Sequence, residues 1–545
     1  MTGAEILAQK LAAAGCKRAF GIPGGEVLAL IDALDKADMK FILTKHENAA
    51  GFMAEGGWHA DGAPGVLIAT LGPGVANAVN VVANAMQDHV PLLFLTGCVD
   101  WAKAERYTHQ VFDHRALLSP IVKASFRAEH GSIGLVAEKA LAIACEDQPG
   151  PVHIDLPIEV AEHPSKETVR PLLNPVLNSA AFSASQNSVF NHAILELQNA
   201  KKPIAIAGLD AVNGNASGII NIFCHEHNIP LITTYKAKGI IDEEDPLVIG
   251  GVGLSPKADQ IVLPLLENSD CIVLLGYDPI EMRAGWCHPW TEEKTVIEIS
   301  PVLRTHGMHW VSHRLHGQIV PTLTQVHETL NKQASSTKWQ DGEAQTARDD
   351  LRSSFMPRAS EDPESFGPEF VFSILNKILP KQKIATADSG AHRILLSQIW
   401  TCHEPRSLLQ STALCTMGCA VPLAMGYKLA KPSHHVVAFV GDAGLEMVLG
   451  ELATLRDLKL PILIVVLVDE SLALIELKQR AAKLSNLGVD FYGSDFPAIT
   501  KALGGYGCWI DTKEELEQET KQALSRDTFT VLACRIGQHA YDGKF

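Results

Sequence analysis

Gly441-Asp442-Ala443-Gly444 directly follows the apolar run Val436-Val437-Ala438-Phe439-Val440, and Asp469-Glu470-Ser471 directly follows a second apolar run from Ile462 to Val468. Uninterrupted runs of this length, rich in β-branched residues, are typical of buried parallel strands. The residues between them, Leu445 to Leu458, have helical composition and end close to a proline. This stretch therefore predicts one strand–helix–strand unit of an α/β fold.

Two aspartates stand at the ends of these predicted strands, 469 − 442 = 27 residues apart. The carboxyl ends of neighbouring parallel strands meet at one edge of a sheet, where open α/β folds bind their ligands. The glycines beside Asp442 let backbone N–H groups approach an anion at a helix N-terminus. A lone aspartate after a strand is most often only a helix cap. The pair predicts a magnesium–diphosphate site, because Mg²⁺ takes hard oxygen ligands and shares them with phosphates.

Length and charge narrow the class of protein. A chain of 545 residues is too long for one hydrophobic core, and we expect three domains. A composition of 46% hydrophobic and 20% charged residues is typical of globular proteins. The net charge of −16 disfavours a nucleic-acid partner, which requires a basic surface. We expect the protein to attract anionic ligands locally, through a metal ion and backbone dipoles.

The eleven cysteines are scattered and contain no Cys-x-x-Cys pair, a pattern typical of reduced thiols in a cytoplasmic protein. The closest two, Cys415 and Cys419, are predicted to be buried thiols, because no matching Cys or His pair lies nearby. Met1 to Ala14 predicts an amphipathic helix and not a signal peptide. No apolar run approaches membrane-spanning length, so we expect a cytoplasmic protein without a membrane partner.

Strand and helix signals alternate in three segments of the chain, separated by two polar stretches. In the first segment, a strand from Gly65 to Thr70 leads into a turn and a small-residue helix from Val75 to Gln87. The first and third segments share this plan. The predicted fold class is α/β, with three doubly wound parallel-sheet domains. Their boundaries are predicted at residues 1–165, 186–333 and 367–545, with linkers at 165–185 and 334–366.

Five motifs occur in order along the chain. They are Gly21-Ile22-Pro23-Gly24-Gly25, the segment Lys45 to Gly56 that begins Lys-His-Glu-Asn, Leu71-Gly72-Pro73-Gly74-Val75-Ala76-Asn77, Ala413-Leu414-Cys415-Thr416-Met417-Gly418, and the Gly-Asp-x-Gly segment with its spacing to Asp469. Together they resemble the thiamine-diphosphate-dependent decarboxylases and carboligases of the acetolactate synthase and pyruvate decarboxylase type. The resemblance implies an N-terminal pyrimidine-binding, a central Rossmann-like and a C-terminal diphosphate-binding domain, with thiamine diphosphate and Mg²⁺ as cofactors.

The resemblance gives two residues specific tasks. Glu47 is implied as the carboxyl group that exchanges a proton with the aminopyrimidine of the cofactor. It stands where a strand-like Phe41-Ile42-Leu43-Thr44 enters a helix of small residues, a setting that favours burial and a raised pKa. Taken alone, Glu47 would be a solvated first-turn glutamate. Met417 is implied as the side chain that supports the bent cofactor, where a lone methionine would otherwise be read as core filler.

The remaining cofactor contacts follow from the same resemblance. Asp442, Asp469 and the carbonyl of Ser471 are the implied magnesium ligands. Asp469 departs from the family, which usually has asparagine there, and so adds a negative charge beside the diphosphate. Ala443 replaces the usual third glycine. The implied cofactor-binding residues are Pro23, Gly24, Thr70, Asn77, Ser389, Ala391, His392, Thr416, Met417, Asp442, Ala443, Gly444, Asp469, Ser471, Leu472, Ala473, Leu474 and Ile475.

On the substrate side, Gln110 matches a glutamine of the synthases, and His109 replaces its aromatic neighbour. Both are implied as catalytic polar groups. Lys478 stands where synthases usually have a tryptophan, and their acceptor-binding arginine has only a shifted match in Arg283. The central domain holds no decisive flavin fingerprint, so FAD remains possible without being evident.

The resulting hypothesis is an acetolactate-synthase-like lyase or carboligase that acts on a 2-oxo acid or related carbonyl compound. Alternatives are a decarboxylase that releases an aldehyde, a weakly catalytic regulatory or binding homologue, and an oxidase or dehydrogenase that uses a flavin in the central domain. The resemblance also implies a homodimer or homotetramer, in which Glu47 of one subunit serves a cofactor bound by residues 388 to 475 of another.

Overall fold

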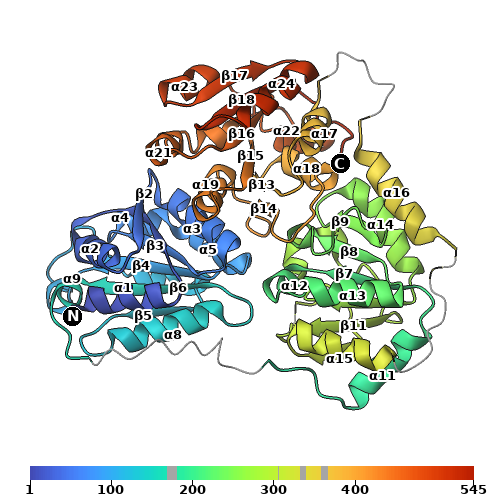
Figure 1. Ribbon diagram of the computed structural model, residues 1–545, viewed down its shortest axis with the longest axis horizontal. Helices are drawn as coiled ribbons and strands as arrows, with labels where there is room; N and C mark the ends of the chain where they lie inside the picture. Colours follow the sequence, from blue (N-terminus) through green and yellow to red (C-terminus); the bar gives the residue numbers. More distant parts are fainter. Residues whose placement is uncertain (168–180, 305, 332–338, 340, 358–365) are drawn as a thin grey trace.

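Three parallel sheets, each covered by helices, make up the molecule (Figure 1). The computed structural model describes residues 1–167, 181–304, 306–331, 339, 341–357 and 366–545. Each sheet has six strands, and every described strand pairing is parallel. Parallel sheets need both faces covered, which explains why their strands are uninterrupted apolar runs. The prediction of three doubly wound α/β domains is confirmed.

The N-terminal sheet has the strand order β2-β1-β3-β4-β6-β5. Its strands are β1 (Arg18–Ile22), β2 (Lys40–Leu43), β3 (Gly65–Ala69), β4 (Leu92–Cys98), β5 (Ala124–Arg127) and β6 (Pro151–Pro157). Its helices are α1 (Gly3–Ala13), α2 (Leu28–Lys36), α3 (Glu47–Asp61), α4 (Pro73–Asn77), α5 (Val79–Gln87), α6 (Trp101–Ala104), α7 (His114–Leu118), α8 (Ile133–Cys145) and α9 (Ile158–Glu162). The helix predicted from Val75 to Gln87 is therefore two helices, α4 and α5, that meet at Ala78.

The central sheet has the order β12-β11-β10-β7-β8-β9. Its strands are β7 (Pro203–Ala207), β8 (Leu231–Thr234), β9 (Val248–Val252), β10 (Cys271–Leu275), β11 (Thr295–Ser300) and β12 (His313–His316). Its helices are α11 (Ser188–Asn199), α12 (Leu209–Asn213), α13 (Ser217–His227), α14 (Pro256–Asn268) and α15 (Ile319–Asn331). The order reverses between β7 and β10, which places a topological switch point there.

The C-terminal sheet has the order β14-β13-β15-β16-β18-β17. Its strands are β13 (Lys383–Ala387), β14 (Leu408–Gln410), β15 (His435–Gly441), β16 (Leu463–Val468), β17 (Tyr506–Ile510) and β18 (Thr530–Arg535). Its helices are α17 (Pro368–Ile378), α18 (Ala391–Ile399), α19 (Ala420–Ala430), α20 (Asp442–Glu446), α21 (Glu451–Leu458), α22 (Ala473–Ala481), α23 (Phe496–Ala502) and α24 (Lys513–Ala523). In chain order this arrangement repeats that of the N-terminal sheet, which confirms that the outer domains are alike.

The outer domains of one chain pack directly against each other through α3 and α19 (Figure 1). The contact is close because small residues face each other: a Cβ atom added at Gly56 would lie 2.1 Å from the carbonyl oxygen of Leu423. One apolar cluster runs from Phe52 and Met53 across to Leu423 and Met425. The helix of small residues that follows Glu47 is therefore an interface between domains.

Two expectations about local structure were wrong. The helix predicted from Leu445 to Leu458 is interrupted, and α20 and α21 are separate helices. The predicted linker at 334–366 contains α16 (Glu343–Phe355), which packs on α14 through buried Ala347 and Leu351. Most of the linker predicted at 165–185 lies outside the described residues.

Two of the predictions concern the state of the cysteines and the apolar character of the helices. Each of the eleven cysteines, all of which lie in the described part of the chain, is free. Cys419 is buried as expected, but the prediction was wrong for Cys415, which is exposed on the loop before α19 with φ at 58°. Among the described residues, no helix is long and apolar enough to cross a membrane.

Candidate cofactor site

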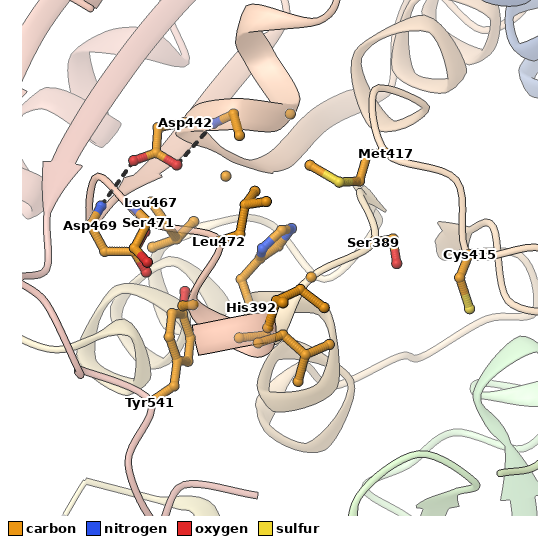
Figure 2. Close-up of a pocket in the computed structure, with 18 residues that line it drawn as sticks. Ser389, His392, Cys415, Met417, Asp442, Leu467, Asp469, Ser471, Leu472 and Tyr541 are labelled. Carbon is orange, nitrogen blue, oxygen red and sulfur yellow. Dashed lines mark hydrogen bonds between the residues drawn. The ribbon is translucent and has the colours of Figure 1, made fainter. Parts of the chain in front are cut away.

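Asp442 and Asp469 meet at the carboxyl edge of the C-terminal sheet. Strands β15 and β16 are neighbours, with Gly441 paired to Leu467. The Asp442 carboxylate accepts the N–H of Ala443 at 2.8 Å through Oδ1 and the N–H of Asp469 at 3.1 Å through Oδ2 (Figure 2). Oδ2 also accepts the N–H of Glu470 at 2.7 Å. The first aspartate therefore fixes the backbone of the loop that carries the second, across 27 residues of sequence.

The surroundings of both carboxyl groups disfavour their ionised forms unless a cation is close by. Burial raises the pKa of Asp442 above its ordinary range. Burial, and then the charge of Asp442, raises the pKa of Asp469 to about 8. A nearby cation favours the ionised form of both groups. The pair is therefore chemically suited to a hard divalent ion such as Mg²⁺.

A cavity of about 170 Å³ lies beside the two aspartates. His392, on the first turn of α18, points into it (Figure 2). Burial, with the nearby Arg393 charge, lowers the pKa of His392 to about 3, so the imidazole is neutral. Its Nε2 atom is buried without a hydrogen-bond partner in the chain, and so is Oγ of Ser471. Unpartnered buried polar atoms at one cavity fit a ligand with acceptor oxygens, as a diphosphate has.

The opposite side of the cavity is formed by the loop before α19. Met417 and Cys415 line it, together with Ser389 and Gly390. The N–H of Ser389 donates to the carbonyl of Thr416 at 3.4 Å, so the two loops are joined. Gly390 has a φ of 157°, and a Cβ there would lie 2.7 Å from the ring of His392. Glycine at 390 is therefore required for the histidine to point into the cavity.

The remaining predicted cofactor residues of this domain also gather here. The cavity is lined by Ala391, Ala443, Gly444, Ser471, Leu472, Ala473, Leu474 and Ile475, whereas Thr416 is bonded to Asn80 of the N-terminal domain through its Oγ1 at 3.1 Å. Sequence reasoning missed Tyr541, which lines the same cavity from the C-terminal tail. Figure 2 shows its hydroxyl directed toward Asp469 and Ser471. No local motif marks Tyr541, because its place depends on how the tail folds back.

The predicted residues of the N-terminal domain form a second group, at the ends of β1 to β3. Glu47 opens α3, is only 4% exposed, and accepts the side-chain N–H of Asn77 on Oε2 at 3.0 Å. Thr70 donates to Glu26 at 2.6 Å, and a Cβ at Gly24 would overlap Thr70 at 2.2 Å. Pro23 directly precedes this contact. None of these residues lines the cavity beside Asp442.

His109 and Gln110 lie on an exposed loop before α7 and do not line that cavity either. Gln110 has a φ of 60°, and its carbonyl packs on Gly72, where a Cβ would lie 2.4 Å away. Arg283 of the central domain pairs with Asp259. Within one chain, the predicted substrate-side residues and the predicted metal ligands are therefore not brought together.

The switch point of the central sheet is filled by charged side chains. Asp210 and Asp278, which follow β7 and β10, both form ion pairs with the buried Arg304. His89 of the N-terminal domain contacts Asp210 at 3.0 Å. Nucleotides bind open α/β sheets at this position. A flavin bound there would have to displace this cluster.

The cavity, the paired aspartates and the repeated outer domains agree with the comparison to known sequences. Residues 1–117 match the thiamine pyrophosphate enzyme N-terminal TPP binding domain, residues 190–326 the central domain, and residues 388–534 the C-terminal TPP binding domain. The chain therefore belongs to the thiamine pyrophosphate-dependent enzymes.

Within that class, several relatives that align over nearly the whole chain are acetolactate synthases. The chain is 27% identical to the acetolactate synthase of Bacillus subtilis (strain 168) over 537 residues, which cover 96% of this chain and 91% of that protein. It is 29% identical to a probable acetolactate synthase large subunit of Methanococcus aeolicus, over 97% of this chain and 90% of the relative. The acetolactate synthase isozyme 1 large subunit of Escherichia coli (strain K12) is 26% identical over 98% and 94%.

Proposed function

We propose that the protein is a thiamine diphosphate- and Mg²⁺-dependent lyase or carboligase that acts on a 2-oxo acid or a related carbonyl compound. The observation that carries the proposal is the pairing of Asp442 with the loop of Asp469 beside a cavity whose other polar atoms, His392 Nε2 and Ser471 Oγ, have no partner in the chain. Paired oxygen ligands beside neutral donors suit a metal-bound diphosphate.

Each group has a defined task in this proposal. Asp442, Asp469 and the carbonyl of Ser471 would hold Mg²⁺, His392 would donate to a diphosphate oxygen once its ring carries a proton on Nε2, and Met417 would support the cofactor rings. The bound cofactor supplies the electron sink for carbon–carbon chemistry. Glu47 holds and returns a proton at the pyrimidine, and Asn77 keeps its carboxylate in place.

The site is completed by a second copy of the chain. Glu47 does not line the cavity of its own chain, so another subunit has to supply it. Large apolar side chains are exposed on both outer domains, including Trp101 at 62% and Phe112 at 41% in the first and Met447 at 64% in the third. Trp101 and Phe112 line one surface cavity together, and contiguous apolar surface of this kind favours a protein–protein contact. We propose a homodimer or homotetramer with the cofactor between subunits.

Proton NMR of the protein with thiamine diphosphate, Mg²⁺ and pyruvate tests the reaction class. We expect pyruvate loss with acetolactate or acetoin as product. Acetaldehyde as the sole product would identify the protein as a decarboxylase and not a carboligase. Bound cofactor without turnover of any 2-oxo acid would favour the regulatory alternative, for which the extra negative charge of Asp469 is the supporting observation. A yellow purified protein would support the flavin-dependent alternative.

Glu47→Gln tests the proton-handling step. The amide keeps the shape and the contact with Asn77 but cannot exchange a proton. We expect cofactor binding to survive and turnover to fall by about 10²–10⁴-fold, the range typical of a lost acid–base group. Near-normal turnover in this variant would remove Glu47 from the mechanism.

A further inference from the structure

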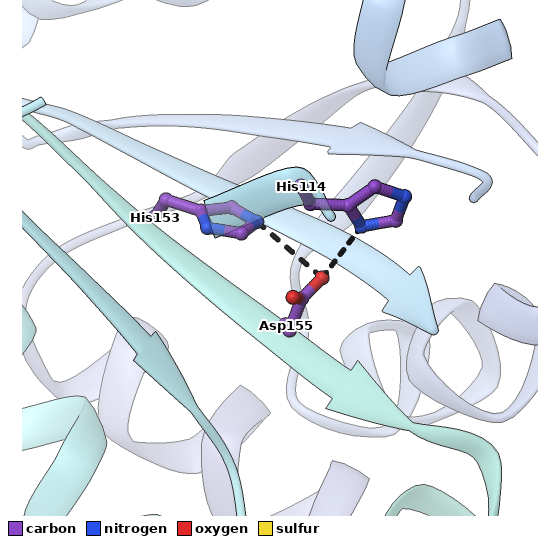
Figure 3. A group of neighbouring side chains, drawn as sticks. All are labelled: His114, His153 and Asp155. Carbon is purple, nitrogen blue, oxygen red and sulfur yellow. Dashed lines mark hydrogen bonds and ion pairs between the residues drawn. The ribbon is translucent and has the colours of Figure 1, made fainter. Parts of the chain in front are cut away.

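A buried group of two histidines and one aspartate lies at the carboxyl edge of the N-terminal sheet, outside the cofactor cavity (Figure 3). His153 and Asp155 are on β6, and His114 opens α7. Asp155 Oδ1 is 2.8 Å from Nδ1 of His114 and 2.7 Å from the hydroxyl of Thr96. The proposed mechanism gives none of these residues a task.

The hydrogen bonds of this group fix the proton positions on both rings. Thr96 has one hydroxyl hydrogen, which it donates to Asp155, so it accepts from Nε2–H of His153 at 2.8 Å. His153 Nδ1 then accepts from Ser125 at 2.8 Å. The N–H of Gly72 donates to Nε2 of His114 at 3.2 Å, so His114 carries its proton on Nδ1 and gives it to Asp155. Every ring nitrogen already has a partner, which leaves none for a metal ion.

The electrostatics of Asp155 agree with this pattern. Burial alone would raise its pKa, but the hydrogen bond from His114 and the ring of His153, whose Nε2 lies 3.5 Å from Oδ1, outweigh burial and hold the pKa well below its ordinary range. Asp155 is therefore a permanent acceptor. A permanent acceptor at Nδ1 keeps His114 in the one tautomer that presents a lone pair to Gly72.

Gly72 connects this network to Glu47. It is the N-cap of α4 with φ at 69°, a left-handed conformation that glycine tolerates. Five residues later, Asn77 at the end of α4 donates to Glu47, and a Cβ at Gly74 would lie 3.3 Å from the Glu47 carboxylate. A shift of the turn at Gly72 therefore moves the Asn77 hydrogen bond to the carboxylate and the backbone at Gly74 that lies beside it.

We propose that His114, fixed in its Nδ1–H tautomer by Asp155, is a positioning residue for Glu47. It acts through the Gly72 turn and α4, and it touches neither cofactor nor substrate. This inference rests on the role of Glu47 in the proposed function. Placement errors of about 1 Å commonly cost an enzyme about 100-fold in rate, so the network has a measurable kinetic effect.

Asp155→Asn tests the tautomer directly. The amide N–H of asparagine donates to Nδ1 of His114, which moves the ring proton to Nε2. There the new N–H faces the N–H of Gly72, and the hydrogen bond between them is lost. We expect the ¹⁵N chemical shift typical of a protonated ring nitrogen to move from Nδ1 to Nε2 of His114. Deuterium exchange at the acidic thiazolium carbon of bound thiamine diphosphate is expected to slow by about 10–100-fold, with cofactor affinity unchanged. Asp100→Asn, at a buried aspartate of the same sheet edge that is outside the network, is the matched control and retains the native rate.

A second pair of variants guards against simple misfolding. His114→Gln keeps an amide N–H for Asp155 and an oxygen for Gly72, so we expect exchange near the native rate. His114→Leu has similar volume but neither group, and exchange is expected to be slow. A native exchange rate in both Asp155→Asn and His114→Leu, or a proton on Nε2 in the unmodified protein, overturns the inference. Native exchange in Glu47→Gln would instead overturn the role of Glu47 itself.

Discussion

Single residues set the charge of the cofactor cavity. Asp469 adds a second buried carboxylate beside Asp442, and burial, followed by the charge of Asp442, raises its pKa to about 8. The neutral His392 and the hydroxyl of Tyr541 face the same space. Together with the unpartnered hydroxyl of Ser471, they are side chains that can offset the extra charge beside a diphosphate.

Asp469→Asn is expected to tighten thiamine diphosphate binding at saturating Mg²⁺. Asparagine keeps an oxygen for the metal and removes one negative charge from the diphosphate, which we expect to lower the dissociation constant by about tenfold. Titration calorimetry measures this. Glu470→Gln is the control, because that side chain is exposed and only its backbone N–H contacts Asp442. Weaker binding in Asp469→Asn would show that the carboxylate acts mainly as a metal ligand.

Glu55 is a second residue with a strong pH signature. It is 2% exposed, accepts the side-chain N–H of Asn84 at 3.0 Å, and lies near the ion pair of Lys236 with Asp88. Burial raises its pKa from 4.5 to about 8, against the opposing charge of Lys236. The folded protein therefore holds this proton more tightly than the unfolded chain. The stability it contributes is complete below pH 4.5 and is lost as the pH rises toward 8.

Glu55→Gln is expected to flatten this pH dependence. Relative to the variant, the free energy of unfolding of the unmodified protein should fall by roughly 1 kcal/mol per pH unit between pH 5 and 8. Thermal or urea unfolding at several pH values measures the difference. Glu517→Gln, on an exposed face of α24, should show no such trend. Parallel pH curves for Glu55→Gln and the unmodified protein would exclude a neutral buried Glu55.

At the scale of elements, the helix boundaries show what local sequence could not predict. The strands around Asp442 and Asp469 were predictable because buried parallel strands are continuous apolar runs. The break between α20 and α21 falls at Met447 to Gly450. The composition of this segment favours a helix, and the break depends on how the neighbouring loops pack. Helix α16 was missed because its exposed face is highly charged and its buried positions are few.

The residues of the candidate site also divide into those that a local motif marks and those that distant contacts place. Asp442, Met417 and Glu47 belong to contiguous motifs and were predicted. Tyr541 and His114 were not, since each has its place only through contacts with residues far away in the sequence. Cys415 is exposed and has a left-handed backbone, and no spacing pattern in the sequence predicts either property.

The C-terminal tail after β18 is an element with its own test. Tyr541 is 3% exposed in the core, and Asp542 pairs with Arg480 at 2.6 Å. Tyr541→Ala is expected to lower the free energy of unfolding by about 3 kcal/mol and to weaken thiamine diphosphate binding, because the tail closes one side of the cavity. Tyr541→Phe keeps the packing and should retain stability. Denaturant unfolding and calorimetry measure both, and unchanged cofactor affinity in Tyr541→Ala would show that the tail does not close the cavity.

At the scale of the molecule, the proposed cofactor site draws on two groups of residues that one chain does not bring together. The outer domains are joined through α3 and α19, and this packing leaves Glu47 outside the cavity of its own chain. In a twofold assembly, a second copy would present its N-terminal domain to that cavity. We therefore propose that the cofactor site forms between subunits.

Subunit mixing tests this central claim most directly. Glu47→Gln and Asp442→Asn proteins are each expected to be inactive in thiazolium-carbon deuterium exchange and in turnover. When the two are unfolded, mixed in equal amounts and refolded, random pairing should restore about one quarter of the native sites, because one site of each mixed dimer has both native residues. Recovery near that level is the predicted result. No recovery from a refolded mixture, with native protein recovering in parallel, would contradict a site shared between subunits.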